Sequence, residues 1–559
     1  MATRRQGKPA GREERKRPEE FGGRLPVALV FPGEASLALS TLGWQAVYRL
    51  LSGHPGLAVE RFYVAPEATR LESEESGRDI GLFPVVAFSI NFELDLLPLA
   101  RALKIASLLL PERRRPAFPL VLGGGPLAFL NPAPLARALD LIFCGEAGKE
   151  FLELMLAVKE KIQSGADKPA LLASVAARPG VYVPGQSPLP VRRVVTIGAP
   201  GALPDPAASV FVSSRAQFAD MFLIEANRGC PHACRFCAAG FVYRPPRQAS
   251  LEQIKNAILE AAPRKIGLVG TALTDWPELP VLLAWLGERK IKYGLSSLRA
   301  DGLTEKLLAI LRRSGLRTVT LALEGASQRL RDAANKHLSE ETFLRAVRLC
   351  AEHGVDHLKI YLIVGWPGET GADYDEFAPL AARVAEVARL AGGGKKSIRH
   401  VTVAVSSLVP KPFTPLEFAP MATQAQLETA IERVQAAAAK IKGMRVTHDS
   451  PLAARVQGLI SRGGEDAFEL AALALENGGS WRKALAAWAG DKTFIDREFP
   501  EDRPFPWEVI DTGVSRAHLL REWRRYKERL ATPACAPADC AGCGACGMDV
   551  FVKGRGTGG

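Results

Sequence analysis

The chain has 559 residues, of which 47% are hydrophobic and 24% are charged. This composition is that of an ordinary globular protein, and it excludes a small scaffold whose core depends on disulfides or metal ions. A chain of this length predicts roughly three or four domains. The formal net charge is +12, part of it in the tail Met1–Lys16. This excess predicts a basic surface, with nucleic acid or another anion as the alternative partner.

The nine cysteines indicate the compartment in which the protein works. Seven of them fall into two tight clusters. Clustering favours metal ligation in a reducing compartment over a secreted disulfide framework. The N-terminus is charged and no apolar segment follows it, so we expect no signal peptide. The sequence has no run of about 18 apolar residues that would predict a membrane span. We therefore expect a cytoplasmic protein without a membrane partner.

Residues 1–24 are charged and interrupted by Gly and Pro, which predicts a disordered basic tail. From 25 to 205, short apolar runs alternate with amphipathic segments such as 37–52 and 94–110. This alternation predicts an α/β domain with a doubly wound, Rossmann-like parallel sheet, followed by a linker. The strand-like runs are PVALVFPG (26–33), LAVERFYVAP (57–66), PVVAFSIN (84–91), PLVLGGGP (119–126) and DLIFCGEAG (140–148).

The run VLGGG (121–125) follows one of these strands directly. A glycine-rich turn at the carboxyl edge of a parallel sheet can admit a nucleotide-like ligand. The run does not fit the pattern G-x-G-x-x-G of dinucleotide-binding proteins. Two interpretations stay open, a ligand cradle and a tight turn without a ligand.

Residues 216–422 are more regular, with strand-like runs separated by helical patterns such as 340–352. Six such βα units predict a partial (β/α)6 barrel, whose chemistry lies on the loops after the strands. Residues 423–530 are mostly helical by pattern, and 531–559 form a Cys-rich tail. The six predicted barrel strands are FLIEA (222–226), KIGLVG (265–270), KYGLSS (292–297), TVTLAL (318–323), KIYLIV (359–364) and HVTVAV (400–405).

Cys230, Cys234 and Cys237 form a C-x3-C-x2-C array on the loop after the first barrel strand. Three close thiolates on one loop suit an iron–sulfur cluster. Three ligands leave one iron of a cubane open, which is typical of a catalytic rather than a structural site. Zinc is the alternative, but a structural zinc needs a fourth ligand, and His232 would serve only with strained geometry.

The pattern C-x3-C-x-aromatic-C after the first strand of a six-unit barrel resembles the radical S-adenosylmethionine (SAM) superfamily. The resemblance implies an enzyme with a [4Fe-4S] cluster whose open iron binds SAM. It also implies an electron donor such as flavodoxin or ferredoxin. One electron would cleave the sulfonium of SAM, and the resulting 5'-deoxyadenosyl radical would abstract hydrogen from a substrate that the sequence does not identify.

The resemblance also assigns cofactor contacts. Phe236 takes the aromatic position that lies near the SAM adenine, and Gly365 belongs to the element IVGWPGET (363–370) that backs onto it. Ser297 and Glu324, which follow or end the third and fourth strands, take positions of polar SAM contacts. This chain has Gly270-Thr271-Ala272 in place of the family's Gly-Gly-Glu element, so other groups must bind the SAM amino group. Arg329 and Arg331 are candidates for the SAM carboxylate.

The N-terminal domain resembles the B12-binding branch of the superfamily through FPGEASLALSTLGWQAVYRLL (31–51), LGGGPLAFLNPAPLA (122–136) and CGEAGKEF (144–151). One feature departs from that branch. No D-x-H-x-x-G motif is present to supply a histidine to cobalt, and His54 is the only histidine of the domain. Two alternatives follow, cobalamin bound without a histidine ligand and a domain that has lost the cofactor. Bound cobalamin would imply methyl transfer to an unreactive carbon or phosphorus.

Four more cysteines near the C-terminus have the spacing C-x4-C-x2-C-x2-C. They predict an auxiliary [4Fe-4S] cluster, with zinc or a flexible tail of redox thiols as the alternatives. The preceding stretch PWEVIDTGVSRAHLLREW (506–523) resembles the end of an uncharacterised bacterial radical SAM family with a B12-like domain. That family has no settled substrate. The four residues are Cys535, Cys540, Cys543 and Cys546.

Three functions are consistent with these features. The first is a radical SAM enzyme, with a cobalamin-dependent methyltransferase as its more specific form. The second is a radical SAM enzyme without cobalamin that modifies RNA or a ribosomal component, which the basic charge motivates. The third is a non-catalytic iron–sulfur redox protein. The open three-cysteine site argues against this last function, because a scaffold gains nothing from an unligated iron.

Overall fold

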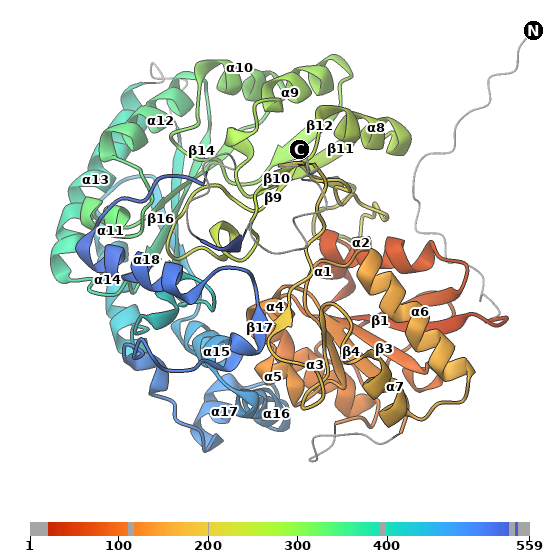
Figure 1. The fold of residues 1–559 in the computed structure, drawn as a ribbon. Helices are drawn as coiled ribbons and strands as arrows, with labels where there is room; N and C mark the ends of the chain where they lie inside the picture. The colour runs from red at the N-terminus through yellow and green to blue at the C-terminus, as the bar shows by residue number, and fades with distance from the viewer. Residues whose placement is uncertain (1–20, 110–116, 200, 392–397, 536–542, 546–559) are drawn as a thin grey trace, which may run out of the picture.

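The computed structural model describes residues 21–109, 117–199, 201–391, 398–535 and 543–545. These form an N-terminal α/β domain, a curved β/α unit and a group of C-terminal helices that lies against both (Figure 1). Most of the predicted basic tail lies outside the described residues. No helix within the described ranges is long and apolar enough to cross a membrane.

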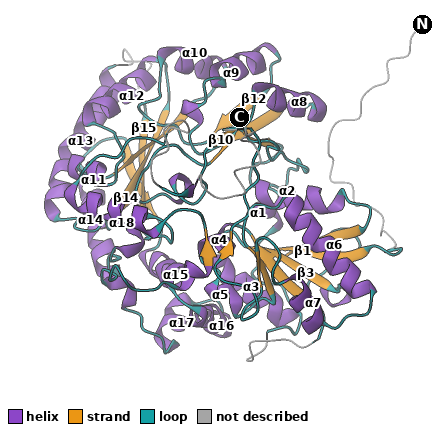
Figure 2. Cartoon of the chain, viewed as in Figure 1, coloured by secondary structure: helices purple, strands orange, loops and turns teal. Residues whose placement is uncertain are grey.

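The N-terminal domain has one sheet with the strand order β2-β1-β3-β4-β5-β6, parallel except for the last strand. Its strands are almost continuously buried because helices cover both faces (Figure 2). The predicted doubly wound sheet is confirmed. Its strands are β1 (Leu25–Phe31), β2 (Leu57–Tyr63), β3 (Val85–Ser89), β4 (Leu120–Gly124), β5 (Leu141–Phe143) and β6 (Val181–Tyr182).

Alternate residues of β1 belong to different cores, which shows how the two faces are covered. Val27 and Leu29 pack with Trp44 of α2 and Met155 of α6, whereas Ala28 faces the other side. The helices of the domain are α1 (Ala35–Ala38), α2 (Leu42–Ser52), α3 (Leu96–Ile105), α4 (Pro126–Leu130), α5 (Ala133–Ala136), α6 (Lys149–Gln163) and α7 (Lys168–Val175).

All six predicted barrel strands are present and pair in parallel with their neighbours. The groups β12-β11-β8 and β13-β14-β15-β16 are joined by a parallel bridge between Leu298 and Leu321. The barrel is thus open between its two edge strands, β8 and β16. The six predicted strands are β8 (Phe222–Glu225), β11 (Lys265–Val269), β12 (Lys292–Leu295), β13 (Thr318–Glu324), β14 (His357–Val364) and β15 (His400–Ser407).

The seventh parallel strand, β16 (Met444–His448), lies in the region that the sequence pattern marks as mostly helical. Its sequence MRVTH is short and no residue of it is fully buried, so it lacks the apolar run that predicts a strand. It extends the barrel sheet beyond residue 422, the predicted end of the barrel.

Helices cover the outer face of the barrel strands (Figure 2). Most of them begin with a Ser or Thr that accepts a hydrogen bond from the first turn, as Ser250, Thr304 and Ser339 do. The helices of the barrel are α8 (Leu251–Ala261), α9 (Leu279–Glu288), α10 (Glu305–Arg313), α11 (Gln328–Ala333), α12 (Glu340–Glu352), α13 (Gly371–Leu390) and α14 (Gln424–Ala439). The C-terminal group consists of α15 (Pro451–Arg462), α16 (Phe468–Glu476), α17 (Trp481–Ala487) and α18 (Arg516–Glu528).

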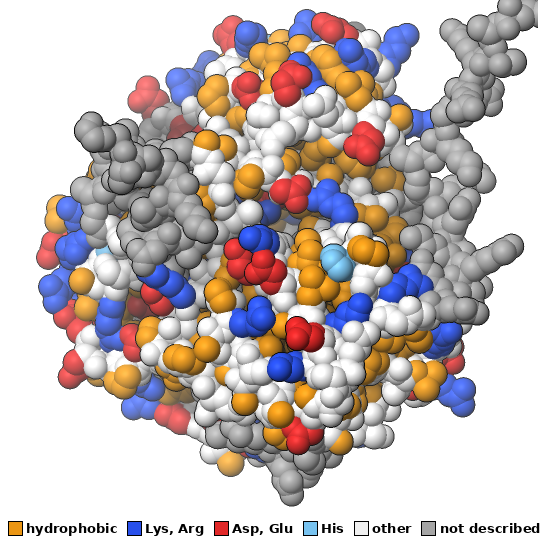
Figure 3. Space-filling view, turned by 45° about the vertical axis from the view of Figure 1, so that its right-hand side comes forward, with side chains coloured by type: hydrophobic (Ala, Val, Ile, Leu, Met, Phe, Trp, Pro, Cys, Tyr) orange, Lys and Arg blue, Asp and Glu red, His pale blue; other side chains and the backbone are white. Residues whose placement is uncertain are grey.

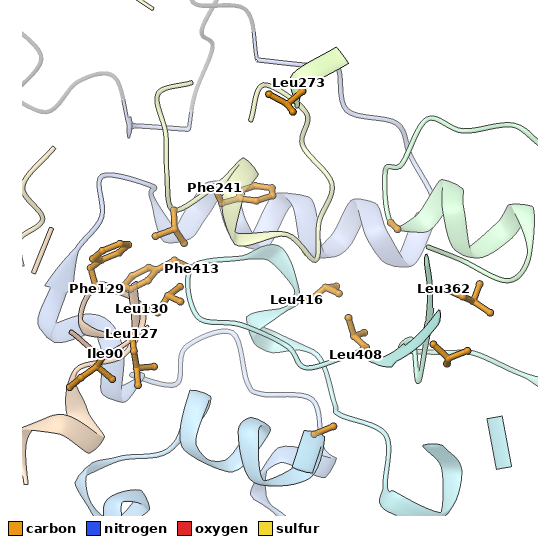
Figure 4. Close-up of a cluster of buried hydrophobic side chains, with 14 of the residues drawn as sticks. Ile90, Leu127, Phe129, Leu130, Phe241, Leu273, Leu362, Leu408, Phe413 and Leu416 are labelled. Atoms are coloured by element: carbon orange, nitrogen blue, oxygen red, sulfur yellow. The ribbon is translucent and has the colours of Figure 1, made fainter. Parts of the chain in front are cut away.

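One continuous hydrophobic core joins the N-terminal domain to the barrel (Figure 4). Ile90 and Phe129, at the carboxyl edge of the N-terminal sheet, pack in it with Phe241 and Phe413 of the barrel. The strand pair β7 (Val191–Arg192) and β17 (Ile510–Asp511) adds a second tie, between the linker and the C-terminal region.

The glycine run at the end of β4 is explained by packing. Gly125 has φ +109, and a Cβ there would lie 2.5 Å from the carbonyl oxygen of Ile90. A Cβ on Gly123 would lie 2.5 Å from Leu139. Close approach of the neighbouring segments thus accounts for two glycines of the turn, which favours the interpretation as a tight turn.

We expect Gly125→Ala to lower the free energy of unfolding by about 2–4 kcal/mol, because strain and overpacking add. The matched control is Gly43→Ala, since a Cβ there meets nothing within 4 Å inside helix α2. That control should stabilise the chain by about 0.5–1 kcal/mol. Urea denaturation of both variants measures the difference, and equal midpoints would contradict the explanation.

Candidate functional site

The three clustered cysteines lie on a loop, residues 229–246, that we call the cysteine loop. It follows β8 and is closed at its base by an antiparallel pair between β9 (Asn227–Arg228) and β10 (Arg247–Gln248). Gly229 has φ +78, and a Cβ there would lie 2.4 Å from the carbonyl oxygen of Tyr243. Because the loop follows β8, it starts at the carboxyl end of the first barrel strand, where βα barrels carry their chemistry.

Backbone hydrogen bonds fold the cysteine loop back on itself. The amide of Cys230 donates to Ala239 O (3.0 Å) and that of Cys237 donates to Cys234 O (3.0 Å). Burial raises the pKa of the Cys230 thiol to about 12 and that of Cys237 to about 11. The neighbouring thiol of Cys234 contributes to both shifts, so the three sulfur atoms share one environment. Three thiolates there need positive charge beside them.

Within the described ranges, no three His, Cys, Asp or Glu side chains converge closely enough to bind one metal ion. A cubane binds each thiolate at a different iron and does not need that convergence. His232, the candidate fourth zinc ligand, is held elsewhere. Its Nε2 lies 2.5 Å from Oδ2 of Asp275, in the segment after β11.

Two cations lie beside Cys234. Burial raises the pKa of the Cys234 thiol, while Lys336 and Arg299 lower it, the latter through a hydrogen bond. Lys336 is buried, and its Nζ lies 3.1 Å from Oε1 of Glu324. Arg299 Nη2 lies 2.7 Å from Oδ2 of Asp301. Glu324 has φ +69 at a register shift that ends β13, which turns its side chain toward this pair. The site can hold a carboxylate and an amine side by side.

An aromatic pair borders the cysteine loop. The rings of Phe236 and Trp366 meet edge to face with centroids 5.3 Å apart, and the Trp366 Nε1 donates to Ile363 O (2.8 Å). Gly365 has φ +84, and a Cβ there would lie 2.5 Å from Leu427 of α14. The predicted contacts Phe236 and Gly365 are thus brought together through Trp366.

The segment after β11 fixes the start of the cysteine loop. The hydroxyl of Thr271 donates to Gly229 O (2.6 Å), and its amide donates to Asn227 Oδ1 (2.7 Å). Ser297, another predicted contact, is exposed at the end of β12, next to Ser296, whose hydroxyl donates to Gly270 O (3.2 Å).

The N-terminal domain reaches the cysteine loop through a buried carboxylate. Glu146 follows β5 and accepts from Arg228 Nη1 (2.7 Å) and from Arg247 Nη2 (2.6 Å). Arg228 and Arg247 are paired residues at the base of the loop. Burial would raise the pKa of Glu146, but the two arginines lower it to about 2. The carboxylate therefore stays ionised and holds both strands of the loop base.

Two family models match this chain. "Radical SAM proteins, N-terminal" matches residues 43–184, and "Radical SAM superfamily" matches residues 224–381, which include the cysteine loop. The chain belongs to the radical SAM superfamily. It is therefore an enzyme whose cofactors are a [4Fe-4S] cluster and SAM.

This chain is similar to several known proteins, which carry different names. An uncharacterised protein of Methanocaldococcus jannaschii is 27% identical over 79% of this chain and 89% of its own length. The anaerobic magnesium-protoporphyrin IX monomethyl ester cyclase of Rubrivivax gelatinosus is 26% identical over 47% of this chain and 48% of its own. Among solved structures, the radical SAM methyltransferase TsrM of Kitasatospora setae has a TM-score of 0.48 and 14% identity, over 71% of this chain and 74% of that one.

The two arginines that the sequence offered as contacts of the SAM carboxylate form other interactions in this structure. Arg329 binds Asp373 (2.5 Å), and Arg331 is fully buried and donates to Leu338 O (3.1 Å). Both arginines are engaged in the structure of the β13–α11 region. Lys336, which follows α11, lies beside Cys234. No periodicity or motif marks it in the sequence.

The C-terminal segment lies over the cysteine loop. The amide of Cys535 donates to Pro231 O (2.7 Å), and Asn335 Nδ2 donates both to Ala233 O (3.1 Å) and to Thr532 O (3.0 Å). Cys543 is buried, and its carbonyl accepts from the amide of Ser515 (2.8 Å). The other two predicted ligands of this set, Cys540 and Cys546, lie outside the described residues.

The carboxyl edge of the N-terminal sheet leaves limited room for a corrinoid. A hollow of about 570 Å³ lies beside the β1–β3 switch point and is lined by residues including Gly33, Leu37 and Pro98. Above β4, by contrast, Phe129 of α4 is buried in the shared core. His54 lies at the amino end of β2, where its Nδ1 accepts from Gly56 N (3.0 Å). The hollow over β1–β3 is thus open space at this edge, and no histidine of this domain lines it.

We expect Glu146→Gln to lower the free energy of unfolding by about 3–5 kcal/mol, because it leaves the buried Arg247 without its counter-charge and Arg228 with Glu225 alone. Reconstituted protein should also bind less iron. The control Glu74→Gln breaks a more exposed pair with Arg215 and should cost about 1 kcal/mol or less. Denaturation curves and iron assays give both values.

The effect should also depend on pH. A folded pKa of about 2, below the usual 4.5, contributes stability that is complete above pH 4.5 and disappears as the pH falls toward 2. The difference between wild type and Glu146→Gln should shrink over that range. A difference that stays constant down to pH 2 would contradict this role of the carboxylate.

Proposed function

We propose that Cys230, Cys234 and Cys237 bind the [4Fe-4S] cluster of this radical SAM enzyme, and that SAM binds its open iron. The supporting observation is the position of these thiols beside the Lys336–Glu324 pair at the carboxyl end of the barrel. When bound, the cluster supplies the electron that cleaves the SAM sulfonium and yields the 5'-deoxyadenosyl radical.

The side chains around the cluster then have defined tasks. Lys336 and Arg299 bind the carboxylate of SAM, because both lie beside Cys234. Glu324 accepts from the amino group of SAM, which replaces the contact that the Gly270-Thr271-Ala272 segment lacks. Phe236 and Gly365 border the adenine, and Ser297 is a further polar contact from β12. Burial of this region by the C-terminal segment keeps water away from the radical.

The more specific proposal is methyl transfer that depends on cobalamin. The sheet order 2-1-3-4-5 of the N-terminal domain, with a hollow at its switch point, supports a bound corrinoid. It would bind without a histidine ligand. The alternative is a radical SAM enzyme without cobalamin that modifies RNA or a ribosomal component, for which the net charge of +12 is the support.

The charge on one face of the molecule does not favour any one class of partner. On the face shown in Figure 3, basic and acidic side chains are interspersed. An electron donor such as flavodoxin or ferredoxin remains part of the proposal, because SAM cleavage needs one electron. A cytoplasmic location likewise remains part of it, since an oxygen-sensitive cluster requires a reducing environment.

We also propose that Cys535, Cys540, Cys543 and Cys546 bind an auxiliary [4Fe-4S] cluster, with zinc as the alternative. The contact of Cys535 with Pro231 supports a place for it close to the first cluster. An auxiliary cluster there would lie near enough to exchange electrons with the catalytic one.

The Cys234→Ala variant should form no 5'-deoxyadenosine when reconstituted and incubated with SAM and dithionite, because the cluster loses one of three ligands. The control is Cys350→Ala, which removes a thiol that is equally buried on α12, away from the loop. It should retain at least half of the wild-type amount. Equal product from both variants, measured by liquid chromatography, would refute the assignment.

The cofactor content of anaerobically purified protein separates the remaining alternatives. Two cubanes predict about eight irons per chain, whereas one cubane with zinc predicts about four irons and one zinc. A bound corrinoid predicts its own absorption bands after the iron–sulfur cluster is removed with acid. Protein without those bands, even after expression with added cobalamin, would contradict cobalamin-dependent methyl transfer and leave radical SAM cleavage intact.

A further inference from the structure

The inner face of β14, β15 and β16 carries a group of cations that the SAM site does not use. Lys359 of β14 pairs in register with Thr402 of β15, and Thr402 pairs with Arg445 of β16. Residues paired in a parallel sheet point to the same side. The alternate residues Leu358 and Val403 point the other way, into the hydrophobic core formed with α13 and α14 on the outer side of the strands. The row therefore faces the interior of the open barrel (Figure 2).

Hydrogen bonds hold the row in place. The Thr402 hydroxyl lies 2.8 Å from His357 Nε2 and accepts from Arg445 Nε (2.9 Å). The imidazole of His400 meets that of His357 at 6.4 Å. Burial lowers the pKa of His357, and the charges of Arg445, His400 and Lys359 lower it further. Lys359 and Arg445 therefore create one positive field, which disfavours the protonated form of His357.

This positive field has no acidic counter-charge paired with it in the described part of the chain. No carboxylate there forms an ion pair with Lys359 or Arg445. The nearby Asp449 instead accepts from the Ser406 hydroxyl (2.9 Å), and Asp356 pairs with Arg317 (2.9 Å). A sheet face that gathers cations without acids is built for an anion from outside the chain.

SAM is not that anion. Its sulfonium is positive, and the proposed SAM contacts lie at the carboxyl ends of the strands. Lys359 lies five residues before the end of β14, which is about 16 Å along the strand. The cations therefore face the space that a substrate would occupy below SAM.

The side chains of the row indicate which chemical class of ligand would bind there. Arg445 offers a planar fork and Lys359 a point charge, a combination that suits phosphate. Tyr361 stands two residues further along β14, about 7 Å nearer to the SAM site, and its ring is 37% exposed. An exposed aromatic ring beside cations on a sheet is typical of sites that stack a nucleobase.

We propose that Lys359 and Arg445 bind the phosphate of a nucleotide substrate whose base reaches Tyr361, the nucleotide being free or part of an RNA strand. This inference rests on the proposed function for its reaction but not for its binding. The phosphate is anchored near the amino ends of β14 and β16, and the sugar or base points along β14 toward the radical.

The test is binding without SAM or reductant, so it does not depend on SAM cleavage. Equilibrium dialysis at 50 mM salt uses the four nucleoside monophosphates, the four nucleosides and a single-stranded 12-mer RNA of mixed sequence. We compare the wild-type chain with Lys359→Gln/Arg445→Gln. The charge-matched control is Arg482→Gln/Lys483→Gln, which changes two exposed residues of α17.

Monophosphates or RNA should bind wild type and control alike, and at least tenfold more weakly to Lys359→Gln/Arg445→Gln. Binding should weaken as salt rises, with a smaller salt dependence for that variant. Nucleosides should bind at least tenfold more weakly than the phosphate-bearing probes. Binding of monophosphates but not of RNA would identify the ligand as a free nucleotide. Binding of RNA but not of monophosphates would identify it as part of an RNA strand. Tyr361→Ala should weaken the binding of nucleotides but leave the binding of inorganic tripolyphosphate unchanged. This comparison separates the contribution of base stacking from that of charge.

Three results would overturn the proposal. They are no binding of any phosphate-bearing probe, equal binding by the two double variants, and nucleosides that bind as well as nucleotides. Thermal unfolding of each variant verifies that it is folded before the comparison. A chain that binds nucleotides yet forms no 5'-deoxyadenosine would refute the proposed function and not this site.

Discussion

The site depends on one buried ionic contact, that of Glu146 with Arg228 and Arg247. Two arginines hold the two strands at the base of the cysteine loop, and they share a carboxylate that belongs to a different domain. Without this carboxylate, Arg228 would keep only its pair with Glu225 and the buried Arg247 would lose its ion pair, which would destabilise the base of the loop. The N-terminal domain thus acts on the cluster site through electrostatics, whether or not it binds a cofactor of its own.

The same reasoning explains why the loop needs support from several sides. Its three thiols are buried, and burial opposes the thiolate form that iron requires. Lys336 and Arg299 offset part of that cost at Cys234. Their own burial is offset in turn by Glu324 and Asp301. The site is therefore a balanced set of charges, each of which would be unfavourable without the others.

Sequence patterns predicted the two α/β units and all six barrel strands, because buried parallel strands appear as apolar runs between helices. The family, its enzymatic nature and its two cofactors were also confirmed. The strand β16 was not predicted because its residues are half exposed or exposed. The place of Lys336 in the site was not predicted because its partner Glu324 is twelve residues earlier, beyond any helical or strand period. The cations of Lys359 and Arg445 come together only through sheet register, which the sequence does not display.

The segment that lies over the cysteine loop makes the environment of this loop depend on residues at the far end of the chain. Thr532 and Cys535, close to the C-terminus, contact a loop near residue 230, and Glu146 supports the same loop from the other side. During synthesis, the loop emerges long before the residues that cover it. The loop is therefore open to incoming iron until Thr532 and Cys535 dock on it. The last residues to be made then close a site that was formed about 300 positions earlier in the chain.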